Sequence, residues 1–175
     1  MQALAFWKAV TRDQGNFLEA LIGLLERLSA RYCVIGGQAV NAYVEPLVSL
    51  DLHLVVAAEE LESVEAALRE HFKVERFAHS LNVSMSGSDL RVQIQTDPRY
   101  GAFVERASRR QVLGVALPVA DIEDVLQGKI WAALDLERRA SKRRKDLLDI
   151  ERILECRPEL RSRVPEEVLG RLGGL

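Results

Sequence analysis

A pair of consecutive glycines between two short apolar segments constrains this chain more than any other feature of its sequence. The first segment is residues 32–35, the glycines are Gly36 and Gly37, and the second segment, residues 51–56, opens with Asp51. Glycine lets a backbone turn sharply or approach a ligand closely, because it has no side chain. The pattern predicts a strand, a glycine turn, a short helix and a second strand that begins with a carboxylate.

Composition narrows the class of protein only slightly. The chain has 175 residues, of which 48% are hydrophobic and 29% charged, and its net charge of -2 indicates neither a nucleic-acid nor a membrane partner. The sequence contains no apolar run of the roughly eighteen residues that a membrane span needs, and its first residues do not resemble a secretory signal. The two cysteines, Cys33 and Cys156, suggest no disulfide framework, so we expect a cytoplasmic protein.

Hydrophobic periodicity and turn residues predict a mixed series of helices and strands. Alternating apolar and polar residues predict a hairpin of strands 81–86 and 90–96, which are joined by a glycine-containing turn. Asp121 is expected to cap a long helix, with Asp124 close to the position of a capping box. The remaining predicted elements are helices 17–29 (capped by Asn16 or Asp13), 38–44, 59–71, 101–110 and 145–155, and strands 32–35, 50–56, 73–78 and 111–118.

This order of elements predicts an α+β fold with a small, mixed or mostly antiparallel sheet and helices on one side. We expect residues 1–118 to form an α/β core. Residues 119–175, called here the C-terminal helical section, are expected to pack on that core as part of one compact unit.

The glycine turn followed by an acid-led strand resembles the signature of the DNA polymerase β-like nucleotidyltransferases, in which a Gly-Gly or Gly-Ser turn precedes an Asp-x-Asp or Asp-x-Glu strand. Residues 117–125, leading to Lys129, and residues 145–150 resemble the C-terminal segment of minimal bacterial nucleotidyltransferases of the abortive-infection and antitoxin-associated types. The resemblance implies a nucleotidyltransferase-like fold. It also implies transfer of a nucleoside monophosphate from a nucleoside triphosphate to a hydroxyl of a small molecule, an RNA or a protein.

In active members of the resembling superfamily, three carboxylates bind two divalent metal ions, such as magnesium or manganese. Two of them come from one strand, where residues i and i+2 point to the same face. By this resemblance, Gly36 and Gly37 form the phosphate turn, and Asp51 is the catalytic carboxylate and first metal ligand. His53 stands where the second acid is expected, although imidazole suits transition metals better than magnesium.

The third acid of the family pattern is expected on the polar face of the strand 90–96, which carries Gln93 and Gln95 instead. The metal ligands implied by the resemblance are therefore Asp51, His53 and Gln93. Other acids that could replace the missing ligands are Glu45, Asp89 and Asp97. The implied triphosphate contacts are Lys129, Lys142 and Lys145.

Residues 138–145 contain six basic residues in eight and allow two interpretations. They form either a solvated helix end, with cations near a helix C-terminus, or a contact for phosphate or RNA. No aromatic residues are interleaved for base stacking, which favours the first interpretation. Asp146 and Asp149 are expected to pair with Arg143 or Lys145.

The sequence leaves two main hypotheses for function. The first is a nucleotidyltransferase whose missing acids are replaced by other ligands. The second is a pseudoenzyme on the same fold, acting as a nucleotide-binding or protein-interaction module of antitoxin-like or regulatory type. A pure RNA-binding protein is a third reading, which the near-neutral net charge argues against.

Overall fold

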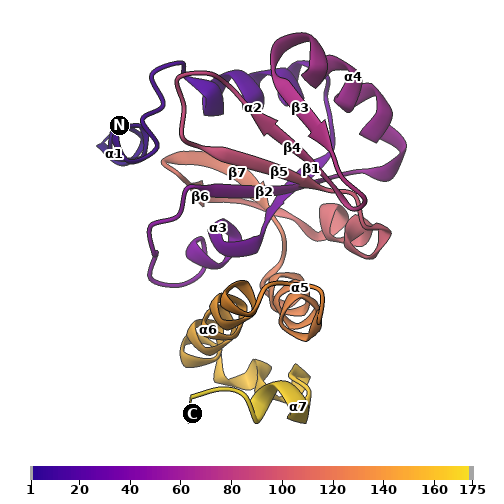
Figure 1. The fold of residues 1–175 in the computed structure, drawn as a ribbon. Helices are drawn as coiled ribbons and strands as arrows, with labels where there is room; N and C mark the ends of the chain where they lie inside the picture. Colours follow the sequence, from indigo (N-terminus) through magenta and orange to yellow (C-terminus); the bar gives the residue numbers. More distant parts are fainter. Residues whose placement is uncertain (1, 174–175) are drawn as a thin grey trace.

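The computed structural model describes residues 2–173, and a seven-stranded mixed sheet lies at their centre (Figure 1). The strands stand in the order β3-β4-β5-β2-β1-β7-β6. The α+β class and the mixed sheet predicted from the sequence are confirmed. The strands are β1 (Tyr32–Ile35), β2 (Asp51–Val56), β3 (Lys73–Arg76), β4 (Ser80–Ser84), β5 (Arg91–Gln95), β6 (Ser108–Val112) and β7 (Val115–Val119).

Strand β2 occupies the middle of the sheet, antiparallel to β1 and parallel to β5. Its register with β5 places Asp51 opposite Arg91 and His53 opposite Gln93. Residues that face each other across neighbouring strands point to the same side of a sheet, so these four side chains share one face. The predicted hairpin is also present, because β4 pairs with β5 in antiparallel register.

Helices lie on both faces of the sheet, so the prediction that they cover one side is wrong. In Figure 1, α2 and α4 cover one face, and α3, α5 and α6 lie on the other. Every residue of β1 is buried, and a strand buried on both sides needs cover on both sides. The helices are α1 (Gln2–Val10), α2 (Phe17–Arg27), α3 (Gly36–Asn41), α4 (Leu61–His71), α5 (Ile122–Leu134), α6 (Ala140–Cys156) and α7 (Glu166–Leu169), with 3₁₀ segments η1 (Ala58–Glu60), η2 (Pro98–Arg106) and η3 (Pro158–Arg163).

Two aspartates cap the N-termini of two of the long helices. The Asp13 carboxylate accepts hydrogen bonds from the backbone N–H groups of Phe17 and Leu18, so Asp13, rather than Asn16, supplies the side-chain cap of α2. Asp121 accepts from the N–H of Glu123 and caps α5 as predicted. Asp124 does not close a capping box, because its carboxylate binds the Arg106 guanidinium at 2.7 and 2.8 Å.

The segment between β5 and α5 differs most from the sequence prediction. Residues 98–106 form 3₁₀ helix η2, and residues 108–119 form a hairpin of β6 and β7 rather than the end of a helix and one extended segment. Leu113 and Gly114 make its turn, with φ angles of 51° and 85°. Two consecutive positive φ angles are typical of the tight turns that join hairpin strands.

The ends of the chain also depart from the prediction. Helix α1 was not predicted, and α6 begins at Ala140, five residues before the predicted start. The basic residues 142–145 therefore lie in the first turns of α6 and not at a helix C-terminus. Within residues 2–173, no helix is both long and apolar enough to cross a bilayer.

Candidate functional site

The glycine turn lies directly against the histidine of β2. Gly36 has a φ of 69°, and a Cβ atom added to it would stand 3.0 Å from Nδ1 of His53. A side chain there would be strained by the backbone and would collide with the imidazole, so both constraints require glycine. Neither constraint applies to Gly37. Its φ is not positive, and nothing lies within 4 Å of a Cβ atom placed on it.

A row of polar side chains crosses four strands on the face that carries this histidine. The register pairs His53 with Gln93, Gln93 with Asn82, and Asn82 with Glu75. The row therefore runs from the glycine turn across β2, β5 and β4 to β3. Alternation in the sequence predicted the shared face of His53 and Gln93, but it gave no sign of Glu75, since β3 is short and its place in the sheet is set by pairing.

Asp51 is an ion-paired carboxylate. Its Oδ1 lies 2.7 Å from Nε of Arg91, and its Oδ2 lies 3.8 Å from Nζ of Lys142. Its side chain is 20% exposed, so it reaches solvent while both oxygens face cations. The register of β2 and β5 places Arg91 opposite Asp51, whereas Lys142 comes from the first turn of α6.

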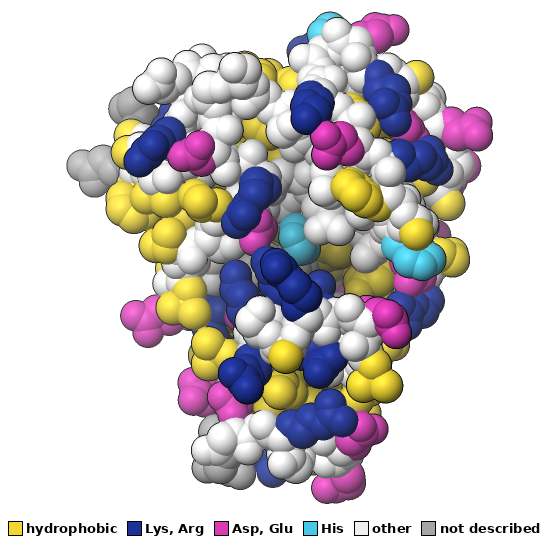
Figure 2. Space-filling view, viewed as in Figure 1, with side chains coloured by type: hydrophobic (Ala, Val, Ile, Leu, Met, Phe, Trp, Pro, Cys, Tyr) yellow, Lys and Arg dark blue, Asp and Glu magenta, His cyan; other side chains and the backbone are white. Residues whose placement is uncertain are grey.

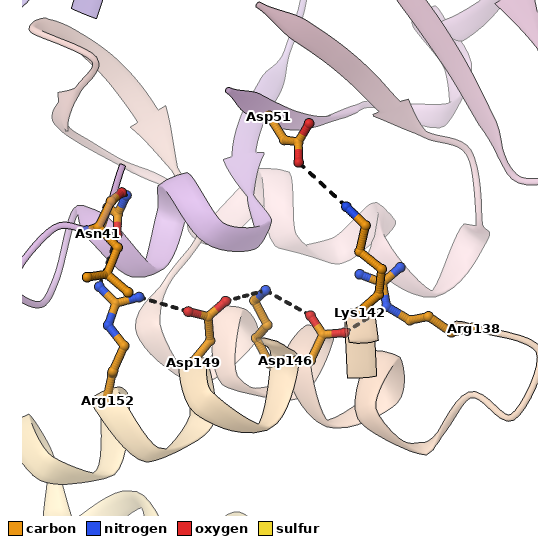
Figure 3. Close-up of polar contacts among 9 residues, drawn as sticks. Asn41, Asp51, Arg138, Lys142, Asp146, Asp149 and Arg152 are labelled. Carbon is orange, nitrogen blue, oxygen red and sulfur yellow. Dashed lines mark hydrogen bonds and ion pairs between the residues drawn. The ribbon is translucent and has the colours of Figure 1, made fainter. Parts of the chain in front are cut away.

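A second group of ion pairs joins α5 to α6 (Figure 3). The buried ammonium of Lys129 lies 3.0 Å from Oδ1 of Asp146 and 2.6 Å from Oδ2 of Asp149. Asp146 also binds Arg138 at 2.7 Å, and Asp149 binds Arg152 at 2.8 Å. The prediction that these aspartates pair with Arg143 or Lys145 is wrong, because the helical periodicity of α6 turns them toward α5.

This second group extends to the loop that follows α3. The Arg152 guanidinium donates to Oδ1 of Asn41 at 3.0 Å and to the carbonyl oxygen of Glu45 at 2.5 Å. The Asn41 side chain in turn bonds both the N–H and the carbonyl oxygen of Leu47. The chain of contacts therefore connects α5 and α6 with the helix that the glycine turn begins.

His53 is neutral at physiological pH. Burial, followed by the nearby charge of Lys129, lowers its pKa to about 4. The Asp51 carboxylate acts in the opposite direction, but Arg138 and Lys142 add to the lowering. A neutral imidazole offers one nitrogen as donor and one as acceptor.

Two cavities meet at this face. The smaller, of about 90 Å³, lies beside Gly36 and Lys129 and has aromatic walls of Tyr100 and Phe103. The larger, of about 350 Å³, is lined by Asp51, Glu75, Asn82, Arg91 and Lys142, among others. Both are bordered by His53, Gln93 and Arg138.

Figure 2 shows Lys and Arg side chains gathered around a histidine in the middle of this face, between the sheet and the C-terminal helices. Sequence reasoning did not single out Tyr100, and it included Arg138 only as a member of the basic segment 138–145. Alternation places Arg91 on the same polar face as Gln93, but it gave Arg91 no role in the site. Lys145 lies apart from both cavities, in a groove beside Gly37.

The donor groups do not fit a pair of divalent metal ions. Within residues 2–173, no three side chains of His, Cys, Asp or Glu gather closely enough to hold a metal. Of the acids considered as replacements, Asp97 is paired with Arg99 at 2.8 Å, and Asp89 faces Arg12 at 3.6 Å. Glu45 is exposed, and its carbonyl oxygen rather than its carboxylate takes part in a contact.

The arrangement of a glycine turn, an acid-led central strand and C-terminal helices defines a nucleotidyltransferase fold. Solved structures agree. The antibiotic-resistance factor ANT(2'')-Ia superposes with a TM-score of 0.56 at 13% identity over 90% of this chain and 95% of that protein. The lincosamide antibiotic adenylyltransferase LnuA, bound to lincomycin, gives a TM-score of 0.54 at 13% identity over 82% of this chain and 99% of that one.

An antigenic nucleotidyltransferase-like protein from Paracoccidioides brasiliensis is similar at 19% identity, with a TM-score of 0.53 over 94% of this chain and 84% of that one. The family match of the sequence is more specific than these structural similarities. The chain belongs to the AbiEii family, described as nucleotidyl transferase toxins of type IV toxin–antitoxin systems, whose profile matches residues 12–171. No curated protein sequence matches the chain significantly.

The family confirms the resemblance to minimal bacterial nucleotidyltransferases and the connection with toxin–antitoxin systems. Nucleotidyltransferases generally use nucleoside triphosphates and divalent metal ions.

Proposed function

We propose that this protein binds a nucleoside triphosphate at the two cavities and transfers its nucleoside monophosphate to a hydroxyl group, with release of pyrophosphate. One observation supports this most directly. Asp51, His53 and Gln93 lie side by side on one face of the sheet, next to the Gly36 turn and within a ring of basic side chains. A polyanionic substrate fits such a ring.

The proposed reaction requires one proton to be removed. The acceptor hydroxyl oxygen attacks the α-phosphorus, the bond from that phosphorus to the bridging oxygen breaks, and its electron pair leaves with pyrophosphate. The hydroxyl proton passes to the carboxylate of Asp51. Arg91 and Lys142, which face this carboxylate, are placed to neutralise charge on the phosphates.

The lysines have different proposed roles. Lys145 borders the groove beside Gly37, where it is able to meet phosphate oxygens held at the glycine turn. A triphosphate contact by Lys129 would require its ammonium to leave Asp146 or Asp149. We therefore propose that Lys129 serves as a positioning residue, which orients Asp146 and through it Arg138.

The proposed acceptor hydroxyl belongs to a small molecule, an RNA or a protein. The solved relatives described as acting on antibiotics support a small molecule by analogy, and the toxin family supports a cellular macromolecule.

The test follows transfer of label from each nucleoside triphosphate, labelled in its α-phosphate, to total RNA, to protein and to aminoglycoside or lincosamide acceptors. Asp51→Ala is expected to lower transfer at least about a hundredfold, as loss of a proton-accepting carboxylate does. Asp89→Ala, which removes a surface carboxylate outside both cavities, is the matched control. Full activity in Asp51→Ala would contradict this assignment of the site.

A second candidate is a binding module without catalysis. It is favoured by the ion pairs of Asp51, whose carboxylate faces two cations in place of further acids. Under this alternative, triphosphate binds stoichiometrically and no pyrophosphate is released with any acceptor.

A further inference from the structure

Charge around the site is unbalanced in favour of cations. Asp51 faces both Arg91 and Lys142. In the neighbouring group, Asp146 and Asp149 are shared by three cations, namely Lys129, Arg138 and Arg152. Each group thus holds one cation more than it holds carboxylates. The other acids that line the cavities are paired individually, Glu75 with Lys73 and Asp124 with Arg106, and leave this surplus unchanged.

This surplus opposes a divalent cation. A metal ion that approached Asp51 would have to displace Arg91 and Lys142, and it would then stand among like charges. The remaining donors on the face, His53 and Gln93, bring no negative charge. Magnesium prefers anionic oxygen ligands and is commonly held by carboxylates together with substrate phosphates. The donor set therefore disagrees with the two-ion site of the wider superfamily.

The same groups suit phosphate oxygens. Guanidinium groups match phosphate in bidentate geometry, and ammonium groups add a point charge. Arg91 is 68% exposed and Lys142 is 41% exposed at the larger cavity, so both can reach a ligand there. Arg138 borders both cavities and uses its Nε atom to bind Asp146.

The amino end of α6 strengthens this argument. Arg139 at its N-cap makes no side-chain capping bond, and the first turn contains no acid. The first turn includes Lys142 and Arg143, which stand at the positive end of the helix dipole. An anion bound beside Lys142 would offset both the dipole and the crowding of cations.

We propose that this site binds the phosphates of its nucleoside triphosphate through Arg91, Arg138 and Lys142, at the amino end of α6, without a divalent cation. The inference rests on the proposed function, since it concerns the same substrate at the same site. It departs from the metal use that is general among nucleotidyltransferases.

Calorimetric titration of the full chain tests it. ATP, GTP, CTP, UTP and inorganic tripolyphosphate are each titrated in EDTA and then in magnesium or manganese. The dissociation constant of the preferred nucleotide in EDTA is expected to lie within about threefold of its value with metal. Arg91→Gln and Lys142→Gln are each expected to weaken binding about tenfold, which is typical for loss of one charged hydrogen bond. Arg12→Gln, an exposed arginine that pairs with Asp89, is the matched control and is expected to change nothing.

Asp51→Asn separates the two binding modes by the sign of its effect. If protein cations hold the phosphates, removal of this carboxylate releases Arg91 and Lys142 and tightens binding several-fold in EDTA. If a metal holds them, the same change weakens binding. Thermal unfolding checks that the Asp51→Asn variant is folded. The affinity of Lys142→Gln provides an independent measure of phosphate binding by the protein's cations.

The outcomes distinguish this inference from the proposed function. Binding that is at least tenfold tighter with metal and weaker in Asp51→Asn overturns the inference and leaves nucleotidyl transfer standing. Binding in EDTA without transfer to any acceptor supports the inference and contradicts the proposed function. No binding of any nucleotide or of tripolyphosphate, with or without metal, overturns both.

Discussion

The two faces of the sheet contact the helices that cover them through different interactions. On the face covered by α2 and α4, strands β2 and β5 present Leu52, Leu54, Val92 and Ile94, each no more than 2% exposed. On the opposite face the same strands present Asp51, His53, Arg91 and Gln93, and the ion pair of Asp51 with Lys142 connects that face to α6.

The difference separates the residues that stabilise the fold from those that shape the site. Burial of apolar side chains is not directional, so the first face requires only residues of suitable size. Ion pairs depend on geometry and on the presence of every partner, so the second face is sensitive to single changes. Substitutions on the two faces should therefore differ in kind as well as in size.

The largest expected effect is on the charged side. Lys129→Ala removes the buried ammonium that Asp146 and Asp149 share, and it leaves each carboxylate, with a side chain only 2% exposed, held by one arginine alone. Removing one partner from a buried ion pair typically costs about 3–5 kcal/mol of unfolding free energy. Urea denaturation measures this loss, and Lys145→Ala, on the exposed side of α6, should change stability by no more than about 0.5 kcal/mol.

A substitution on the apolar face sharpens that comparison. Leu54→Ala removes a fully buried side chain and should cost about 2–5 kcal/mol through lost burial and a cavity. Nucleotide affinity of the folded fraction should be unchanged in this variant and reduced in Lys129→Ala. Equal loss of affinity in both would mean that the two faces are not independent.

Substitutions in the glycine turn should have an intermediate effect on stability, and the two neighbouring glycines serve as test and control. Gly36→Ala places a Cβ atom 3.0 Å from the His53 ring at a φ of 69°, and such backbone strain costs about 1–3 kcal/mol. Gly37→Ala meets open space within α3 and should be neutral, or stabilising by up to about 1 kcal/mol. Thermal unfolding of the two variants compares them directly. Similar destabilisation by both would contradict the tight contact with His53.

The effect that is smallest at neutral pH is a dependence of stability on pH, which develops only as the solution is acidified. The pKa of His53 is about 4 in the folded protein, below its ordinary value of 6.5. As pH falls through 6.5, the unfolded chain gains this proton first, so the unfolding free energy decreases until about pH 4. His53→Gln should reduce the slope in this window. Stability curves measured in urea at a series of pH values provide the test.

Local patterns predicted much of the fold. Alternation identified the β4–β5 hairpin, and i, i+2 parity correctly put Asp51 and His53 on one face. The β6–β7 hairpin was missed because Leu113, a residue rarely found at positive φ, occupies its turn together with Gly114. A turn of this kind becomes visible only when both strands are already paired.

Long-range pairing accounts for what the sequence did not reveal about the site. Lys129 lies 17 residues from Asp146 in the chain, and only the packing of α5 against α6 brings them together. Glu75 joins the polar row through the pairing of β3 with β4. The composition of residues 138–145 predicted a basic region. Lys142 reaches Asp51 because α6 begins at Ala140, which the sequence did not predict.

The cation-rich first turn of α6 also bears on how the molecule opens. A helix end with like charges at its positive pole and no side-chain cap is the part of that helix least protected against fraying, so its amide hydrogens exchange with solvent before those of the turns around Ile150 and Ile153. Lys142, the residue of this turn that faces Asp51, would gain order when an anion binds beside it. If phosphates bind here as proposed, occupancy of the cavity would be coupled to the length of α6 that is folded.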